Sequence, residues 1–167
     1  MRFFTRGWAD GEYSDKQDEE AEAGYQARLR ELAPRLTPPM AQLASESLHD
    51  SILESARWSP HTKELQLCFI AGSLESGYRA VSLTYRGAML GRERVAALRR
   101  VARDREACVL YHEVDLDEQD GTLIHRYLFW PSEELTIDFV EMAINVEGRA
   151  DSRVPLAAFR EELPEDD

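Results

Sequence analysis

The sequence predicts a single α+β domain, in which two N-terminal helices precede an antiparallel sheet of about six strands. Three observations predict this fold class. Apolar residues recur at helical spacing over residues 1–47, they alternate with a period of two from Leu48 onward, and short turns separate most of the alternating segments. Periods of 3.6 and 2 residues are typical of helices and strands respectively. A length of 167 residues corresponds to about one domain.

The first helix is predicted to begin after Ser14. Ser14 and Gln17 have the spacing of a capping box, in which each side chain can satisfy a backbone group of the first turn. An apolar stripe follows at helical spacing and comprises Ala21, Tyr25, Leu29, Leu32 and Leu36. We expect Pro34 to end or kink this helix, because proline has no N–H to donate.

A second helix is predicted from Pro38 to about Ser47. Thr37 is suited to the N-cap position and Pro38 to the first helical position, where a missing N–H costs nothing. Met40 and Leu43 are expected to be buried.

Six segments predict β-strands, and a third helix at residues 92–105 separates them into two meanders of three. The strands are expected at residues 51–58, 64–71, 78–85, 107–116, 122–130 and 135–146. Short links favour antiparallel pairs, because parallel pairs need long crossovers. We expect the six strands to form one sheet in residues 48–147, with helices covering one of its faces. The acidic tail, residues 148–167, is expected to be partly disordered.

The composition limits the classes of function. The net charge of −12 argues against nucleic-acid binding, which needs clustered Lys and Arg, and it permits a cationic protein partner. The N-terminus lacks the apolar core of a signal peptide, and no apolar run reaches the ~20 residues of a membrane span. Arginine greatly outnumbers lysine, which favours a bacterial source with a GC-rich genome. We expect a cytoplasmic bacterial protein without a cofactor, in which Cys68 and Cys108 are buried thiols.

The candidate catalytic residues are three histidines and two carboxylates: His49, Asp50, His112, Glu113 and His125. An imidazole oriented by a carboxylate can act as a general base. The alternative for His49 and Asp50 is a structural cap, in which the histidine bonds a backbone carbonyl. If Asp120 and Gly121 form a two-residue turn, His112 and His125 lie roughly 13 Å apart along the strands, too far for one metal ion.

The loop at residues 115–121 is the one candidate metal site. It carries Asp115, Asp117 and Asp120, and calcium is bound by several converging carboxylate oxygens. However, the spacing departs from that of a calcium loop by one residue, which favours a solvated hairpin tip. With the two-residue turn, Asp115 opposes Arg126 as a cross-strand ion pair.

The predicted third helix carries the one basic patch of the sequence. Its candidate partner-binding residues are Arg92, Arg94, Arg99, Arg100 and Arg103. Such a patch could bind an anionic ligand or an acidic partner. The alternative is a solvated face that pairs with the carboxylates of the protein itself.

Two sets of segments resemble known families. Residues 1–8 (MRFFTRGW), 111–116 (YHEVDL) and 125–131 (HRYLFWP) resemble a family of uncharacterised bacterial proteins, and this resemblance implies no known activity. Residues 48–52 (LHDSI), 65–69 (LQLCF) and 83–88 (LTYRGA) are similar to a pattern in small acidic immunity proteins of polymorphic toxins. The long N-terminal helices depart from that second pattern.

The sequence therefore leaves three hypotheses about function. The leading hypothesis is a non-enzymatic protein-binding domain, with an immunity or antitoxin role as its most specific form. The second is a small hydrolase-like or metal-dependent enzyme, which requires the five candidate catalytic residues to converge in one pocket. The third is a homo-oligomeric structural domain that pairs through exposed sheet edges.

Overall fold

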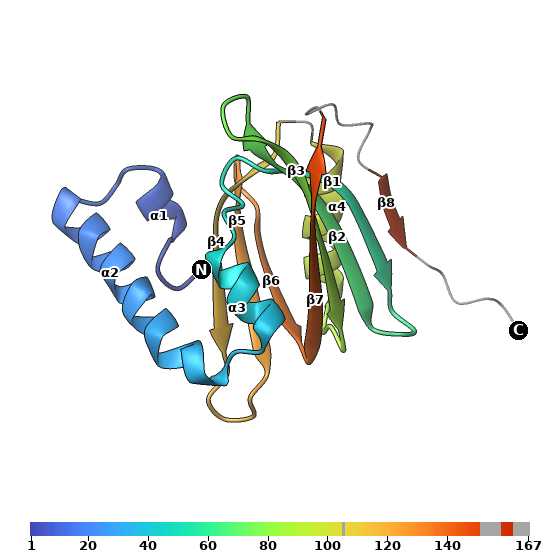
Figure 1. Cartoon of the computed structure of the whole chain (residues 1–167), viewed down its shortest axis with the longest axis horizontal. Helices are drawn as coiled ribbons and strands as arrows, with labels where there is room; N and C mark the ends of the chain where they lie inside the picture. The colour runs from blue at the N-terminus through green and yellow to red at the C-terminus, as the bar shows by residue number, and fades with distance from the viewer. Residues whose placement is uncertain (105, 151–157, 162–167) are drawn as a thin grey trace, which may run out of the picture.

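The strands form two sheets, A and B, whose inner faces pack against each other (Figure 1). The computed structural model describes residues 1–104, 106–150 and 158–161. The α+β class and the antiparallel pairing are confirmed, but seven antiparallel strands in two sheets replace the expected six in one.

The N-terminal helices follow the prediction with one addition. A short helix at residues 6–9, capped by the Thr5 hydroxyl, was not expected. The capping box is confirmed, since the Ser14 N–H donates to Gln17 Oε1 at 3.0 Å. The helices and the 3-10 turn are α1 (Arg6–Ala9), α2 (Asp15–Leu32), η1 (Ala33–Arg35) and α3 (Pro38–Ser45).

Sheet A has the strand order β7-β3-β2-β1-β8. The first four strands are antiparallel, and β8 is parallel to β1. β8 falls within the tail for which no strand was predicted, whereas the expected disorder at residues 162–167 lies outside the described residues. The strands are β1 (Ile52–Ser59), β2 (Glu64–Ser73), β3 (Gly77–Arg86), β7 (Glu141–Arg149) and β8 (Ala158–Glu161).

Sheet B has the order β4-β5-β6, with β4 (Cys108–Leu116), β5 (Leu123–Trp130) and β6 (Glu134–Phe139). The segment predicted as one strand at residues 135–146 is thus two strands in different sheets. The chain leaves sheet B at the exposed Val140 and enters sheet A as β7. The sequence carries the signal for this break. The apolar positions are odd-numbered through Phe139 and even-numbered from Met142, so the alternation changes phase at the corner.

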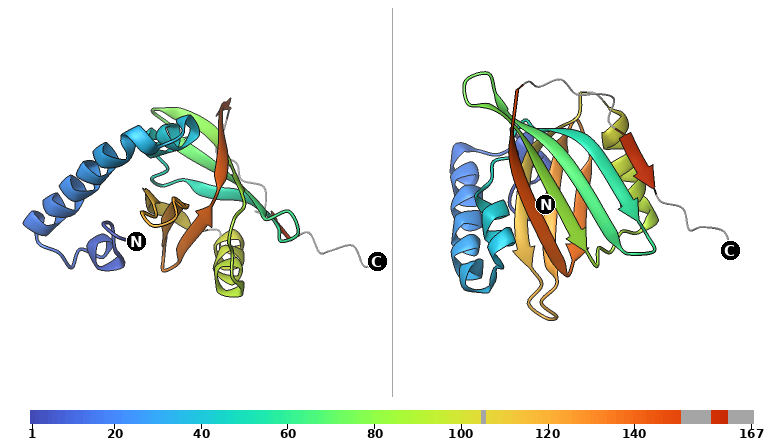
Figure 2. Two further views of the ribbon diagram at one scale, coloured as in Figure 1. Left: turned by 90° about the horizontal axis from the view of Figure 1, so that it is seen from below. Right: turned by 45° about the vertical axis from the view of Figure 1, so that its right-hand side comes forward.

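The expectation that the helices cover one face of a single sheet is wrong: α3 and α4 (Arg92–Arg103) close the sides of the two-sheet stack, whereas α2 packs against β4 of sheet B. α3 packs against β7 and β4, whereas α4 packs against β1, β6 and β8. α3 and α4 therefore each bridge the two sheets (Figure 2). Within the described ranges, no helix combines the length and apolar character needed to cross a membrane.

The core lies between the sheets and is rich in aromatic side chains. Phe69 of β2 stacks on Tyr127 of β5 with ring centroids 5.5 Å apart, and Tyr85 of β3 meets Phe139 of β6 edge-on at 4.9 Å. All four rings are fully buried. Burying each such ring contributes roughly 1.5–3 kcal/mol, so these contacts are a main source of the attraction between the sheets.

Candidate functional site

The β4–β5 hairpin brings His112 and His125 into contact, which corrects the predicted register. The link is residues 117–122, so Leu116 opposes Leu123, and His112 opposes Tyr127. The two histidines are then diagonal neighbours on one face, with His112 Nδ1 3.1 Å from His125 Nε2. The expected separation of about 13 Å is wrong because Asp117 and Thr122 pair within the loop.

A buried chain of polar side chains, here called the relay, extends from this pair into the core. The Glu46 carbonyl oxygen lies 2.9 Å from His112 Nε2. The Tyr85 hydroxyl lies 2.7 Å from His125 Nδ1 and 2.7 Å from the Tyr127 hydroxyl. Tyr85 belongs to sheet A and Tyr127 to sheet B, so the relay joins the two sheets within the core.

Burial keeps the relay uncharged at neutral pH. Desolvation lowers the pKa of His112, although the Glu46 carbonyl and nearby carboxylates oppose this effect. Desolvation, together with the neighbouring His112, lowers the pKa of His125 well below its usual value. Burial likewise raises the pKa of Tyr85 and Tyr127. Both imidazoles are therefore neutral near pH 7.

Glu113 lies on the opposite face of β4 from His112 and binds the backbone of residues 2–4. Its carboxylate accepts hydrogen bonds from three successive backbone N–H groups, those of Arg2, Phe3 and Phe4, at 2.7–3.1 Å. The side chain is only 1% exposed. This contact holds residues 2–4 on the outer face of sheet B, so the carboxylate already has a structural partner.

His49 and Asp50 form a corner between α3 and β1. His49 Nδ1 donates to the Leu110 carbonyl at 2.6 Å, as the cap interpretation predicts. Its ring contacts Tyr111, whose side chain faces away from His112. The structure thus brings His112 and His125 together but leaves His49, Asp50 and Glu113 outside that pair, and the convergence that the enzyme hypothesis requires is not met.

The three candidate metal-binding aspartates each have internal partners. Asp115 pairs with Arg28 at 2.9 Å and with Arg126 at 3.1 Å. Burial would raise the pKa of Asp115, but hydrogen bonds from the Leu116 amide and these two arginines lower it. Asp117 and Asp120 accept from backbone amides within the loop. Among the described residues, no three His, Cys, Asp or Glu side chains are arranged to hold a metal ion.

The arginine-rich helix α4 is partly engaged with sheet B. Arg94 pairs with Asp138 at 2.5 Å and Arg100 pairs with Glu133 at 2.5 Å. Arg92 and Arg99 line a hollow next to Trp58, and Arg103 lines another next to Trp130. Two of the five arginines therefore fasten the helix, which favours the structural interpretation for those two.

The outer face of sheet A, here called the open face, is not covered by a helix in the described part of the chain (Figure 2, right). Mostly uncharged polar side chains, together with Arg57, form two rows across four strands of this face. Register places Ser55, Cys68, Ser82 and Asn145 in one row, and Arg57, Gln66, Thr84 and Ala143 in the other.

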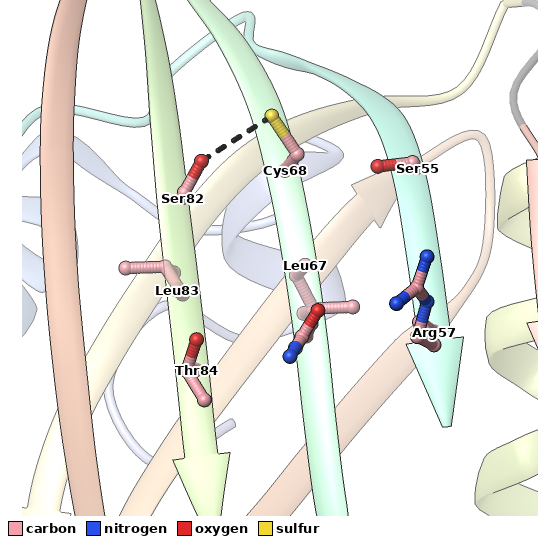
Figure 3. Close-up of a pocket in the computed structure, with 8 residues that line it drawn as sticks. Ser55, Arg57, Leu67, Cys68, Ser82, Leu83 and Thr84 are labelled. Carbon is pink, nitrogen blue, oxygen red and sulfur yellow. Dashed lines mark hydrogen bonds between the residues drawn. The ribbon is translucent and has the colours of Figure 1, made fainter. Parts of the chain in front are cut away.

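A hollow of about 470 Å³ lies over β1, β2 and β3 on the open face (Figure 3). Arg57 lines it and is exposed. Among the described residues of sheet A, Arg79, Arg86 and Arg149 pair with carboxylates, whereas Arg57 has no such partner. Its guanidinium lies in the hollow with the hydroxyls of Ser55 and Thr84, so the hollow offers hydrogen-bond donors to a ligand.

Cys68 on the open face is a hydrogen-bonded thiol. Its Sγ donates to Glu54 Oε2 at 3.3 Å and accepts from the Ser82 hydroxyl at 3.6 Å. Burial, followed by the effect of Glu54, raises the pKa of this thiol. Both cysteines are free, but each is half-buried and not enclosed in the core as predicted.

The sequence reasoning missed both the open face and the two tyrosines of the relay. The alternation in β1, β2 and β3 does place small polar residues on one side, so a polar face was detectable. The sequence did not reveal that no helix in the described part of the chain covers this face. Tyr127 follows His125 by two residues, which puts both on one side of β5, but Tyr85 reaches them only through sheet packing.

Comparisons with protein-family models, curated proteins and solved structures found no match to this chain. The interpretation of the site therefore rests on its geometry.

Proposed function

We propose that this protein is a binding domain that holds a protein partner on the open face of sheet A. The observation that carries the proposal is the hollow on a sheet face that no described helix covers. It is lined by small hydroxyl and amide side chains and by Arg57, which has no carboxylate partner among the described residues. Arginine at the centre of an interface is a common energetic anchor. The exposed Arg57 guanidinium can donate to a carbonyl or carboxylate oxygen of the partner.

The alternative of an enzyme finds less support in the geometry. The hollow contains no histidine or carboxylate among its lining residues, and its one thiol is held protonated by its surroundings. The two histidines that do meet are packed in the core. A general base must reach the proton that it abstracts, and neither group faces the hollow.

The charge of the chain favours a partner of net positive charge. A net charge of −12 attracts a cationic protein over a Debye length of about 8 Å and speeds encounter. This is the chemistry expected for a toxin-neutralising role, and the resemblance to immunity proteins supports the same hypothesis. The bacterial source, the cytoplasmic location and the lack of nucleic-acid binding stay predictions.

The experiment is affinity capture from extract of the source organism with matched variants. Ser82→Tyr fills the hollow, whereas Thr136→Tyr places the same side chain on the outer face of sheet B. Both positions are half-buried strand residues, and tyrosine is well tolerated in strands. We expect one protein to be retained by the wild type and by Thr136→Tyr and to be lost from Ser82→Tyr. Equal capture by both variants, or no specific partner for the wild type, would contradict the proposal.

Self-association is the second candidate, and the edge of sheet A favours it. β7 is the last strand on its side of sheet A and pairs only with β3 among the described strands. Edge strands with free backbone groups can pair with a second chain. Light scattering at micromolar concentration distinguishes the candidates, because a binding domain of the first kind should be monomeric when alone.

A further inference from the structure

The hydrogen-bond direction of the buried relay can be assigned from one end. The Glu46 oxygen is a backbone carbonyl and can only accept, so His112 Nε2 carries the hydrogen. A neutral His112 then has a bare Nδ1, which accepts from the Nε2–H of His125. The bare Nδ1 of His125 accepts from the Tyr85 hydroxyl, and the Tyr85 oxygen accepts from the Tyr127 hydroxyl. Every hydrogen in the relay has one acceptor.

We infer that the relay is a pH-sensitive device, in which uptake of one proton by His112 reverses the hydrogen bonds that join the two sheets. His112 is the half-buried member of the relay, whereas His125, Tyr85 and Tyr127 are fully enclosed. A proton from water therefore reaches His112 first.

The reversal follows from counting the hydrogen-bond donors and acceptors of the relay. A proton on His112 Nδ1 faces the hydrogen already on His125 Nε2, so these two nitrogens no longer form a hydrogen bond. Pairing is restored only when the single hydrogen of His125 sits on Nδ1, since its bare Nε2 then accepts from His112. His125 Nδ1–H now donates to the Tyr85 oxygen, and the Tyr85 hydroxyl turns to Tyr127. The relay gains one proton, and the Tyr127 hydroxyl is left buried without an acceptor in the relay.

The groups around His112 are compatible with such a response. From the end of α3, the Glu46 carboxylate faces it, and Arg79 of β3 neutralises that carboxylate through an ion pair of 2.6 Å. From β4 itself, Glu113 acts through the strand from the opposite face. From β5, His125 is the titratable neighbour. The two carboxylates favour a proton on His112, whereas burial opposes it.

The consequence concerns how sheet A is held on sheet B. The bond between Tyr85 and Tyr127 crosses between the sheets, and the bond between Tyr85 and His125 does so as well. Both change direction when His112 is protonated. A change in acidity at one side of the stack thus alters the hydrogen bonding at its centre without any ligand.

Nitrogen-15 NMR of the imidazole rings in the full chain tests this inference directly. At neutral pH we expect both His112 and His125 to be in the Nε2–H form. As the pH falls, His112 should become doubly protonated while His125 keeps a single hydrogen and moves it to Nδ1. The exposed His61 provides the spectrum of an isolated ring as an internal control.

Three outcomes would overturn the inference. The first is an Nδ1–H form of His125 at neutral pH, because the assigned direction would then be wrong. The second is a His125 tautomer that stays constant while His112 titrates. The third is unfolding of the chain before His112 titrates, because no reversal would then occur in the folded protein.

Discussion

Sheets A and B share one core, but their outer faces differ in the polar groups that they carry. Sheet B presents the buried carboxylates of Glu113 and Asp115, which fasten residues 2–4 and Arg28 of α2 onto it. Sheet A presents hydroxyl and amide side chains, and its carboxylates, such as Glu54 and Glu147, are half-buried or exposed; this face stays open in the described part of the chain (Figure 2). A buried carboxylate requires donors, so it recruits a covering segment, whereas a serine or threonine can be satisfied by water. The difference indicates that the type of polar residue on the outer face of a sheet determines whether a segment covers that face or leaves it open.

The largest expected loss of stability comes from releasing residues 2–4 from the outer face of sheet B. Glu113→Ala leaves the backbone N–H groups of residues 2–4 without their acceptor, and at about 1–3 kcal/mol for each unsatisfied donor the three together are expected to cost about 3–5 kcal/mol. We expect urea unfolding to show a loss of that size, and hydrogen exchange to show lost protection at residues 2–4. Glu147→Ala, on the open face, is the matched control and should unfold like the wild type. Equal stability of the two variants would show that Glu113 does not hold the cover.

The next effect concerns the contact between the sheets. Tyr85→Phe removes the acceptor of the Tyr127 hydroxyl and the donor to His125 together, whereas Tyr127→Phe removes only one donor to Tyr85. An unsatisfied buried donor costs about 1–3 kcal/mol, so Tyr85→Phe should destabilise the fold by roughly 2–3 kcal/mol and Tyr127→Phe by about 1 kcal/mol. Thermal and urea unfolding measure both. Similar losses for the two variants would indicate that the relay runs in the other direction, because each substitution would then leave one buried donor without an acceptor.

A smaller effect is expected from acidification. The folded-state pKa values of His112 and His125 lie below the unfolded value of 6.5, so the unfolded chain binds more protons as the pH falls below 6.5. Stability is fully present above that pH and falls as the pH drops towards the folded-state values, by at most about 1.4 kcal/mol per pH unit for each group. Asp115, with a lowered pKa, contributes its loss only below its usual value of 3.8.

The measurement is the free energy of unfolding between pH 7.5 and 5, with His112→Asn as the comparison. The variant should show a shallower slope, since one of the two buried imidazoles is gone. His61→Asn removes an exposed imidazole and should keep the slope of the wild type. Parallel slopes for the wild type and His112→Asn would contradict the prediction.

The smallest effect on stability is expected on the open face. Thr84→Ala and Arg57→Ala remove side chains that have no protein partner among the described residues, so each should change the free energy of unfolding by less than about 0.5 kcal/mol. Under the proposed function, both should nevertheless weaken capture of the partner. A large loss of stability would show that the face has a structural role, and the contrast with sheet B would fail.

The sequence by itself determined the class of elements. Periodicity, the capping box at Ser14 and the prolines after Thr37 were sufficient for α2, α3 and α4, because these signals act within a few residues of the chain. The strands β1 to β5 were located for the same reason. The phase change at Val140 was also present in the sequence, although only the structure showed that it separates two sheets.

Only the tertiary structure decided which polar residues meet. His112 and His125 come together because the loop after Leu116 is six residues long, and a register change of two residues moves side chains by a whole strand repeat. Tyr85 joins them through packing of one sheet on the other, over about 40 residues of sequence. The open face likewise depends on where the helices dock. Local patterns cannot encode these contacts, because they depend on distances between segments that are far apart in the chain.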